Sequence, residues 1–330
     1  MSKNKKIKSN QFPSDKILGE TITLLENNDP KGFDIYKEMF GKTGYALKIG
    51  ITGSPGVGKS TLIDKLIDCF MNENKSIATL LIDPSNPVHG GAFLGDRIRM
   101  QRHSMDNKVF IRSLANRGYQ GGVTSTLRPI LHVLDGFGFD IILVETVGTG
   151  QDETEIRDIV DITLVLFEPG SGDMIQFSKS GLLDIGDILV VNKSDIPQSK
   201  QVLRDLEMRF HLKPATEKTP RILSISAKTG EGISSLYQAI IKCNQDLMKS
   251  DELENRRKNQ LVTEIRDFLK SHAVNDILSF LEKSGNFDSL VKQVMDKKSN
   301  PYTIAEIIYN SWNEKLANHK SGNKKSKNKR

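Results

Sequence analysis

The sequence predicts an α/β fold in which a mainly parallel β-sheet is flanked by helices, with further helices added at both ends. Three observations lead to this prediction. Apolar, strand-like runs alternate with helical segments from Tyr45 to about Gln245. A glycine-rich loop of the kind that binds phosphate lies between the first of these runs and the helix after it. From Asp251 onward the strand patterns stop and only helical patterns follow.

The apolar patterns divide the chain into elements and regions. Seven strands are expected, at 46–52, 76–82, 108–112, 139–145, 161–167, 187–191 and 221–225. Helices are expected within 13–44 on either side of Asn28-Asp29-Pro30, and near the end at 253–273, 274–283, 287–297 and 303–317. The predicted organisation is a basic disordered N-terminus (1–12), N-terminal helices (13–44), a nucleotide-binding domain (45–250), a helical dimerisation region (251–316) and a basic disordered tail (317–330).

The helical region after Asp251 has two interpretations on its pattern alone. A helical appendage of this length cannot bury its whole apolar face on one small sheet domain, which favours an oligomer interface. Close packing onto its own domain is nearly as well supported at this stage.

The net charge of +6 comes from the two ends of the chain. Ten lysines and arginines and no acidic residue lie in the first eight and the last eleven positions, and the remainder holds 37 basic and 41 acidic residues. The body of the protein is therefore mildly acidic, and nothing interleaves aromatic with basic residues. Nucleic acid is not an expected partner.

The two cysteines and the hydropathy pattern indicate the cellular compartment. Cys69 and Cys243 are far apart and show no metal-ligand spacing, which fits a reduced cytoplasm. No apolar stretch is long enough to cross a membrane, and the basic start is not followed by the apolar core of a secretory signal. A cytoplasmic protein without a membrane partner is expected.

Residues 53–60 match the phosphate-loop pattern G-x-x-x-x-G-K-[ST] and predict a P-loop NTPase. Glycines allow backbone N–H groups to surround phosphate oxygens, and the helix that follows adds its positive end. Lys59 would contribute charge for the β- and γ-phosphates, and Ser60 a hydroxyl for Mg²⁺. The nucleotide-binding candidates in this loop are Gly53, Ser54, Pro55, Gly56, Val57, Gly58, Lys59, Ser60 and Thr61.

Two later strings predict that the base is guanine. The strand at 187–191 is followed by Asn192, Lys193, Ser194 and Asp195, the N-K-x-D pattern whose carboxylate accepts from the N1–H and amino group of guanine. The strand at 221–225 is followed by Ser226, Ala227 and Lys228, the usual partner loop near the guanine O6. In this order and at strand ends, the strings predict binding of GTP and GDP.

Three carboxylates are expected around the phosphates. Asp83 and Glu145 end predicted strands, and Asp96 lies in the segment between strands. Glu145 stands where most GTPases place the Asp of D-x-x-G, so Gly148 would offer its N–H to the γ-phosphate. With Ser60, these carboxylates are the candidate Mg²⁺ ligands, and with Lys59 they are the catalytic candidates.

These strings resemble one family, the MeaB/ArgK GTPases, which includes the methylmalonic aciduria type A proteins. The similarity runs from about Ala46 to Gly232 and recurs at Asn300-Pro301-Tyr302-Thr303. It is carried by DPSNP and GGAFLGDRIRM within 83–100, FIRSLANRGYQGGVT at 110–124, ETVGTGQDE at 145–153, PGSGD at 169–173, and NKSD.

The resemblance implies a homodimeric GTPase with slow intrinsic turnover. Its implied role is chaperone of adenosylcobalamin-dependent methylmalonyl-CoA mutase, gating cofactor delivery and protecting or reactivating the mutase. It also implies that Lys59, Ser60, Asp83, Asp96 and Glu145 surround Mg²⁺ and the γ-phosphate, and that the C-terminal helices dimerise.

One segment departs from the family pattern. Members commonly have P-G-A-G-D-E-L-Q-x-x-K after the strand that precedes N-K-x-D, a loop that signals to the mutase. Here 169–179 is PGSGDMIQFSK, which keeps Asp173, Gln176 and Lys179 but has Met174 in place of the acid, and Glu168 precedes the proline. We expect the retained residues to report the mutase to the GTP site.

Two alternative functions use the same sheet and loop. A metallocentre-assembly GTPase would need a His-rich tract or paired cysteines, and a transport-associated kinase would need a second substrate pocket with its own base; the sequence indicates neither. Within the GTPase reading, Gln151 is a candidate for orienting water, although it also fits the start of a helix. No arginine finger is assigned among Arg97, Arg99 and Arg117.

Overall fold

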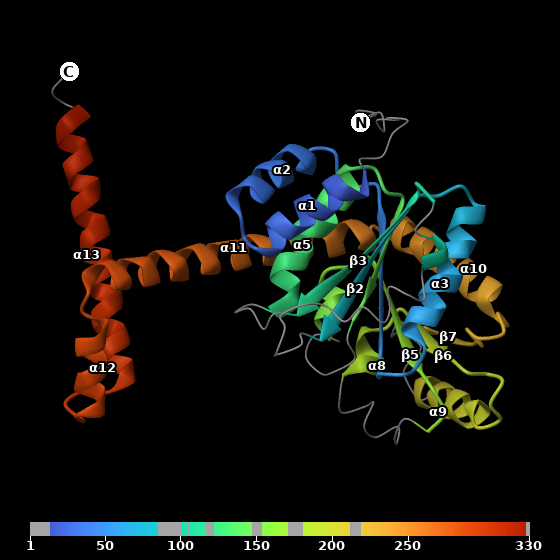
Figure 1. Cartoon of the computed structure of the whole chain (residues 1–330). Coiled ribbons are helices and arrows are strands. Elements are labelled where there is room, and N and C mark those ends of the chain that lie inside the picture. The colour runs from blue at the N-terminus through green and yellow to red at the C-terminus, as the bar shows by residue number, and fades with distance from the viewer. Residues whose placement is uncertain are drawn as a thin grey trace. The chain divides into compact units, whose positions relative to one another are not determined.

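A computed structural model of the 330-residue chain describes residues 14–84, 101–103, 106–116, 122–146, 154–170, 181–211 and 219–327 (Figure 1). The chain divides into two compact units, Met1–Val262 and Thr263–Arg330. No helix among the described residues is long and apolar enough to cross a membrane.

The first unit is built on a seven-stranded sheet in which every strand pairing is parallel. The strands lie in the order β3-β2-β4-β1-β5-β6-β7, so β1 is central. The predicted fold class is confirmed. The strand bounds are β1 Leu47–Gly53, β2 Ile77–Pro84, β3 Val109–Asn116, β4 Ile141–Glu145, β5 Ile162–Phe167, β6 Ile188–Val191 and β7 Arg221–Ser224.

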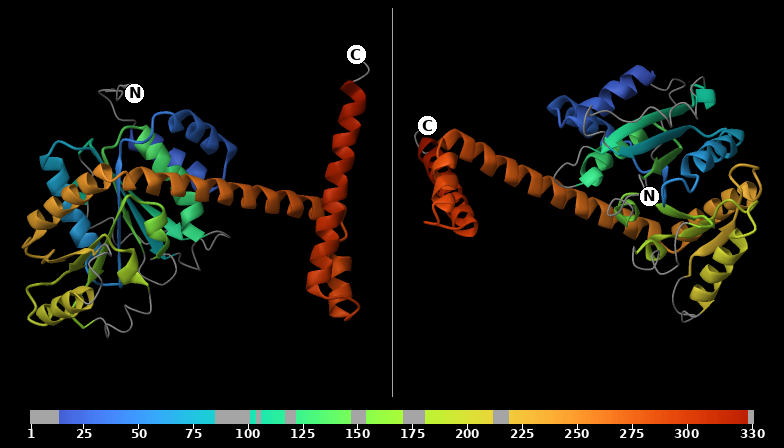
Figure 2. Two further views of the ribbon diagram at one scale, coloured as in Figure 1. Left: turned by 180° about the vertical axis from the view of Figure 1, so that it is seen from behind. Right: turned by 60° about the horizontal axis from the view of Figure 1, so that its bottom comes forward.

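Helices cover both faces of this sheet (Figures 1 and 2). One face carries α3 (Lys59–Asn72) and α10 (Ile233–Lys249). The other carries α5 (Gly122–Gly136) with α1 (Asp15–Glu26) and α2 (Pro30–Phe40). Further along this second face, α8 (Leu182–Ile185) and α9 (Ser199–His211) cover β5 and β6. The described part of the unit also contains two short 3₁₀ helices, η1 (Gln101–His103) and η2 (Ile156–Asp158).

Alternate strand residues supply the two cores. In β4, Ile141 and Leu143 pack under α3, whereas Ile142 and Val144 pack under α5. Because both faces are covered, β4, β5 and β6 are nearly continuous apolar runs without polar alternation. That is why they could be recognised in the sequence as buried parallel strands.

Buried carboxylates tie the start of the C-terminal helix α11 (Glu252–Ser284) to the first unit. Asp161, whose side chain is fully buried, accepts hydrogen bonds from Lys48 N (3.0 Å) and from Nε and Nη2 of Arg257 (2.9 and 2.7 Å). Arg256 forms a two-pronged pair with Asp187 (2.9 and 2.7 Å). Paired in this way, a buried carboxylate is stable, whereas loss of one partner would leave an uncompensated charge. These pairs are why the first unit includes α11 as far as Val262, whereas the sequence-based division falls at residue 250.

The second unit is entirely helical in its described part. It contains the rest of α11, then α12 (Phe287–Met295) and α13 (Pro301–Lys327), with α12 beside the first turns of α13 (Figures 1 and 2). Asn300 caps α13 by accepting from Thr303 N at 3.0 Å, and Pro301 occupies the first helical position.

The helix boundaries of this unit differ from the sequence-based ones in two places. The segments expected at 253–273 and 274–283 form one continuous helix, because Ala273-Val274 contains no glycine or proline to break it. α13 continues to Lys327, beyond the predicted end at Ala317.

Candidate functional site

The phosphate loop connects β1 to α3 and depends on its glycines. The backbone φ angles of Gly53, Gly56 and Gly58 are 142°, 81° and 97°, values that L-residues with side chains rarely adopt. A Cβ on Gly53 would lie 2.5 Å from the carbonyl oxygen of Leu166, and one on Gly58 would lie 2.4 Å from Asn192 Nδ2. Backbone conformation and packing therefore both require glycine here, as the motif predicted.

The first residues of α3 bring a lysine and a serine to the loop. Lys59 is buried, and its Nζ donates to the carbonyl oxygens of Gly53 (2.8 Å) and Ser54 (3.2 Å). Ser60 Oγ donates to Glu145 Oε1 at 3.0 Å, so the end of β4 meets the start of the helix. The structure thus brings together Lys59, Ser60 and Glu145, which the sequence had assigned to one site.

The other phosphate-edge candidates are only partly visible. In the β2–β4 register, Leu81 lies opposite Glu145, so the backbone of Asp83 follows two residues further along at the same edge of the sheet. The side chain of Asp83, and residues Asp96 and Gly148 as a whole, lie outside the described residues. The same is true of the other residues considered for catalysis and signalling: Arg97, Arg99, Arg117, Gln151, Asp173, Gln176 and Lys179.

Asn192, directly after β6, joins three loops through one buried side chain. Its Nδ2 donates to the carbonyl oxygen of Val57 in the phosphate loop at 2.7 Å. Its Oδ1 accepts from Lys193 N (2.8 Å) and from Ala227 N (3.0 Å). The first residue of the predicted base-reading motif therefore holds the phosphate loop and the S-A-K loop in fixed positions.

Asp195 lies beside the second of these loops. Ser226 Oγ donates to Asp195 Oδ1 at 2.7 Å. This hydrogen bond, with smaller help from the backbone amide of Asp195 and the charges of Lys228 and Lys193, lowers the pKa of the Asp195 carboxyl. Asp195 is therefore ionised at neutral pH and can accept two hydrogen bonds from one edge of a base.

Lys193 reaches from the same motif back to the phosphate loop. Its Nζ donates to the carbonyl oxygen of Gly56 at 3.1 Å and is ion-paired with the carboxylate of Glu168. The predicted base-reading and phosphate-binding groups are therefore connected by direct contacts at the carboxyl edge of the sheet. This is the edge at which open parallel sheets bind their ligands.

The family follows from comparison with known proteins. A family model described as "Methylmalonyl Co-A mutase-associated GTPase MeaB" matches residues 18–281, which is most of the chain. The chain belongs to the MeaB family.

Curated relatives agree with this assignment. A putative GTPase of Pyrococcus abyssi is 38% identical over 87% of this chain and 90% of its own length. GTPase ArgK of Escherichia coli is 31% identical over 84% of this chain and 86% of its own length. The mitochondrial methylmalonic aciduria type A homolog of Caenorhabditis elegans is 32% identical over 93% of this chain and 82% of its own length. The resemblance inferred from the motifs is confirmed, and the chain is a GTPase that hydrolyses GTP to GDP.

A solved structure supports the same fold. The crystal structure titled LAO/AO transport system kinase superposes with a TM-score of 0.65 at 24% sequence identity, covering 90% of this chain and 93% of that one. At this sequence identity the similarity concerns the fold alone, and the kinase activity is that of the other protein.

The oxygen donors of this MeaB-family site fit Mg²⁺. Magnesium prefers a small set of hard oxygen ligands and keeps several waters. The Ser60 hydroxyl and the Glu145 carboxylate face each other at 3.0 Å, and both residues are mostly buried. A hydroxyl and a carboxylate at the start of the phosphate-loop helix are a suitable donor pair for a metal that also binds phosphate oxygens.

The sequence analysis missed a hydroxyl pair next to this site. Thr146 Oγ1 donates to Thr52 Oγ1 at 2.9 Å, and both residues are buried. Thr146 N also donates to the carbonyl oxygen of Ile51 at 3.1 Å. The pair fastens the backbone after Glu145 to the end of β1, directly before the phosphate loop. Only the β1–β4 pairing reveals it, since the two threonines are 94 positions apart.

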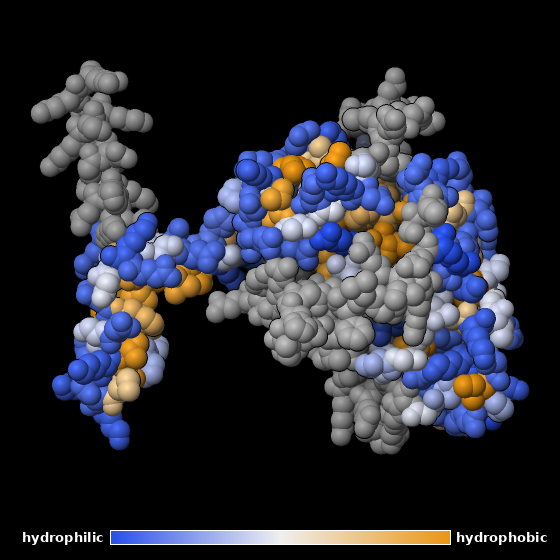
Figure 3. Space-filling view, in the orientation of Figure 1, coloured by the Kyte–Doolittle hydropathy of each residue, from blue (hydrophilic) through white to orange (hydrophobic). Residues whose placement is uncertain are grey.

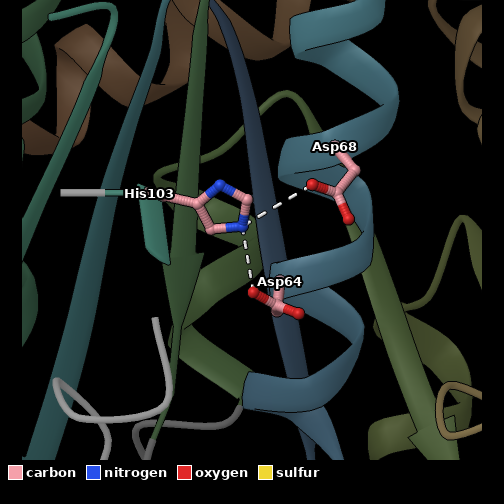
Figure 4. A group of neighbouring side chains, drawn as sticks. All are labelled: Asp64, Asp68 and His103. Atoms are coloured by element: carbon pink, nitrogen blue, oxygen red, sulfur yellow. Dashed lines mark hydrogen bonds and ion pairs between the residues drawn. The ribbon is translucent and has the colours of Figure 1, made fainter. Parts of the chain in front are cut away.

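A second group of possible metal ligands lies on the outer side of α3 (Figure 4). His103 Nε2 lies 2.9 Å from Asp64 Oδ1 and 3.8 Å from Asp68 Oδ1. However, the Arg102 guanidinium contacts both carboxylates at 2.6 Å. Because these acids are already compensated, we interpret the group as an ion-pair cluster that fastens η1 to α3.

Base selection is the first prediction. Asp195→Asn should lower GTP affinity by about 100-fold or more, because the site would lose an acceptor for two guanine donors. The same variant should gain affinity for xanthosine triphosphate, whose C2 oxygen can accept from the new amide. Competition titrations against a fluorescent GTP analogue measure both, with Asp205→Asn on α9 as a control for the same change elsewhere. A wild-type chain that binds ATP as tightly as GTP would contradict the assignment.

Proposed function

We propose that this GTPase acts as a chaperone of an adenosylcobalamin-dependent methylmalonyl-CoA mutase, gating cofactor delivery and protecting or reactivating the mutase. The observation that carries the proposal is the match of residues 18–281 to a family described as mutase-associated. Relatives that include a methylmalonic aciduria type A homolog support it. A GTP site whose two halves are held together by buried contacts suits a protein that reports its nucleotide state to a partner.

We further propose the roles of the site residues. The phosphate-loop residues Gly53–Thr61 bind the phosphates, with Lys59 offsetting charge on the β- and γ-oxygens. The base is read by Asp195, while Asn192, Lys193, Ser226, Ala227 and Lys228 form its pocket. When bound, Mg²⁺ would supply further charge neutralisation, held by Ser60 and, with its waters, by Asp83, Asp96 and Glu145. Gly148 would donate to the γ-phosphate.

In this arrangement the protein positions groups and supplies charge, with little covalent chemistry of its own. The Lys59 ammonium lies within the phosphate loop, where it donates to the carbonyl oxygens of Gly53 and Ser54. Glu145 accepts from Ser60 Oγ and so orients its hydroxyl lone pairs away from β4. We assign no arginine finger within the chain. Slow intrinsic turnover, accelerated by a partner, is the expected consequence.

Catalysis gives the second prediction. Glu145→Ala should lower single-turnover GTP hydrolysis by about 10- to 100-fold while changing GTP affinity by less than about 3-fold, because the carboxylate acts on charge arrangement in the transition state. Lys59→Ala should instead abolish tight triphosphate binding. Glu145→Gln keeps an acceptor for Ser60 and serves as the matched variant for local structure. An unaltered single-turnover rate of GTP hydrolysis in Glu145→Ala would contradict a catalytic role for Glu145.

The mutase partnership gives the third prediction. Purified methylmalonyl-CoA mutase should raise the GTPase rate of the full chain by about 10- to 100-fold, the range that a coupling of a few kcal/mol produces. Gln176→Ala/Lys179→Ala should keep the basal rate and lose the stimulation. A cobalamin-independent enzyme at the same concentration is the control. Equal rates with and without mutase, together with no effect on mutase inactivation, would contradict the proposal.

We also propose that the chain forms a homodimer through its C-terminal helices. Apolar side chains gather on these helices in the space-filling view (Figure 3). On α11, Ile265 and Leu269 are one turn apart and 59% and 65% exposed, and Tyr302 on α13 is 72% exposed. Exposed apolar residues clustered in this way are typical of an interaction surface. A second copy of the chain would cover them.

The fourth prediction tests this surface. Ile265→Glu/Leu269→Glu should convert the dimer to a monomer in light scattering, because each charge would have to be desolvated at the interface. The matched control is Met208→Glu on α9, since Met208 is equally exposed (66%) but lies in the GTPase unit. A double variant that stays dimeric would move the interface elsewhere, and a monomeric wild type would favour packing of these helices on their own chain.

A further inference from the structure

Glu168 is a carboxylate that immediately follows β5 and faces the guanine-reading motif. Its side chain is only 13% exposed and is ion-paired with Lys193 Nζ, whose own side chain is 37% exposed. The same ammonium group donates to the carbonyl oxygen of Gly56 in the phosphate loop at 3.1 Å. Three segments of the nucleotide site, from β5, from β6 and from the phosphate loop, therefore meet at one lysine head group.

The position of Lys193 determines what its side chain does. A guanine nucleotide has its base at Asp195 and its phosphates at the loop that contains Gly56, so the nucleoside between them must pass along Lys193. The backbone of Lys193 is itself fixed, with φ at 62° and its N–H donating to Asn192 Oδ1. The four-carbon stem is thus held at both ends and offers an apolar surface to the sugar and base.

The Lys193 ammonium group needs the Glu168 carboxylate to stay in this position. A lysine side chain carries large rotamer entropy, and one neutral carbonyl acceptor offsets little of it. A charged acceptor makes a stronger hydrogen bond, and a largely buried carboxylate is screened less by solvent than a surface one. Glu168 supplies that charged acceptor from the end of β5, outside the N-K-S-D motif.

We propose that Glu168 is a positioning residue of the guanine-nucleotide site, which holds Lys193 across the path of the nucleoside. The proposal rests on the assignment of guanine nucleotides to the phosphate loop and N-K-S-D, and it adds a residue that neither motif contains. It also accounts for a departure from the family pattern, the glutamate that precedes Pro169.

The ligand concerned is the nucleoside part that GDP and GTP share. Glu168 acts through Lys193 on that part and has no contact with the γ-phosphate position through this pair. Release of GDP and of GTP should therefore change by the same factor, and the rate of the chemical step should not change. An effect on GTP alone would indicate a different role.

The fifth prediction is a double-mutant cycle on the full chain, measured as dissociation of fluorescent N-methylanthraniloyl-GDP and -GTP in a stopped-flow instrument. Glu168→Gln and Lys193→Ala should each accelerate release of both nucleotides by about 3- to 10-fold, the range of one partly buried charged contact. The double variant should be no faster than the faster single variant, because both changes remove the same contact. Glu168→Asp, which keeps the charge, should restore part of the effect.

Glu231→Gln is the matched control, since it removes one negative charge from an exposed position on the loop after Lys228. It should release nucleotide at the wild-type rate, which separates the ion pair from a general change in charge. Wild-type release rates in Glu168→Gln, or single effects that multiply in the double variant, would overturn the proposal. If Asp195→Asn fails to change base choice, the assignment of the guanine site itself is wrong, whatever Glu168 does.

Discussion

The hydrogen bonds of one buried amide, that of Asn192, set the frame on which the nucleotide site depends. The side chain is 2% exposed and uses Nδ2 to hold Val57 and Oδ1 to hold Ala227 and its own neighbour Lys193. A buried amide with an unmade hydrogen bond is costly, so these contacts are made together or lost together. Glycine at position 58 follows from the same constraint, because a Cβ there would collide with Nδ2. Phosphate binding and base recognition thus share one rigid junction.

The parallel sheet separates two kinds of polar chemistry by edge. Its carboxyl edge carries the nucleotide-binding loops, whereas its amino edge carries Asp161 and Asp187, which bind Arg257 and Arg256 at the start of α11. Asp161 and Asp187 are each compensated by an arginine and by one backbone N–H, that of Lys48 for Asp161 and that of Thr163 for Asp187, so they stabilise the fold only while α11 is in place. The first turns of α11 are therefore fixed within the GTPase unit at the edge opposite the nucleotide-binding loops.

How much the sequence could predict depends on whether a signal was local. The phosphate loop, N-K-S-D and the apolar runs of β1 and β6 are short patterns in which neighbouring residues specify backbone and chemistry together, so fold and base choice were within reach. The contact of Ser60 with Glu145 was expected only because both stood at strand or helix ends of one edge. The Thr52–Thr146 bond and the pairs of Arg256 and Arg257 join residues far apart in sequence, and no periodicity encodes such partners. The sequence-based helices 253–273 and 274–283 form one helix, α11, since no glycine or proline lies between them.

Glu168 shows how a departure from a family pattern acquires meaning once its partner is known. In sequence it is an acidic residue at the end of a buried strand, where an apolar residue would fit the run of β5. In the fold this residue, directly after β5, forms an ion pair with Lys193, so the carboxylate is compensated and its burial costs less. The residue after it begins the turn at Pro169–Gly170, which opens the segment proposed to sense the mutase. A displacement of that turn would move Glu168 and, through the ion pair, shift Lys193 beside the nucleoside. A partner could in this way influence nucleotide retention without touching the phosphates.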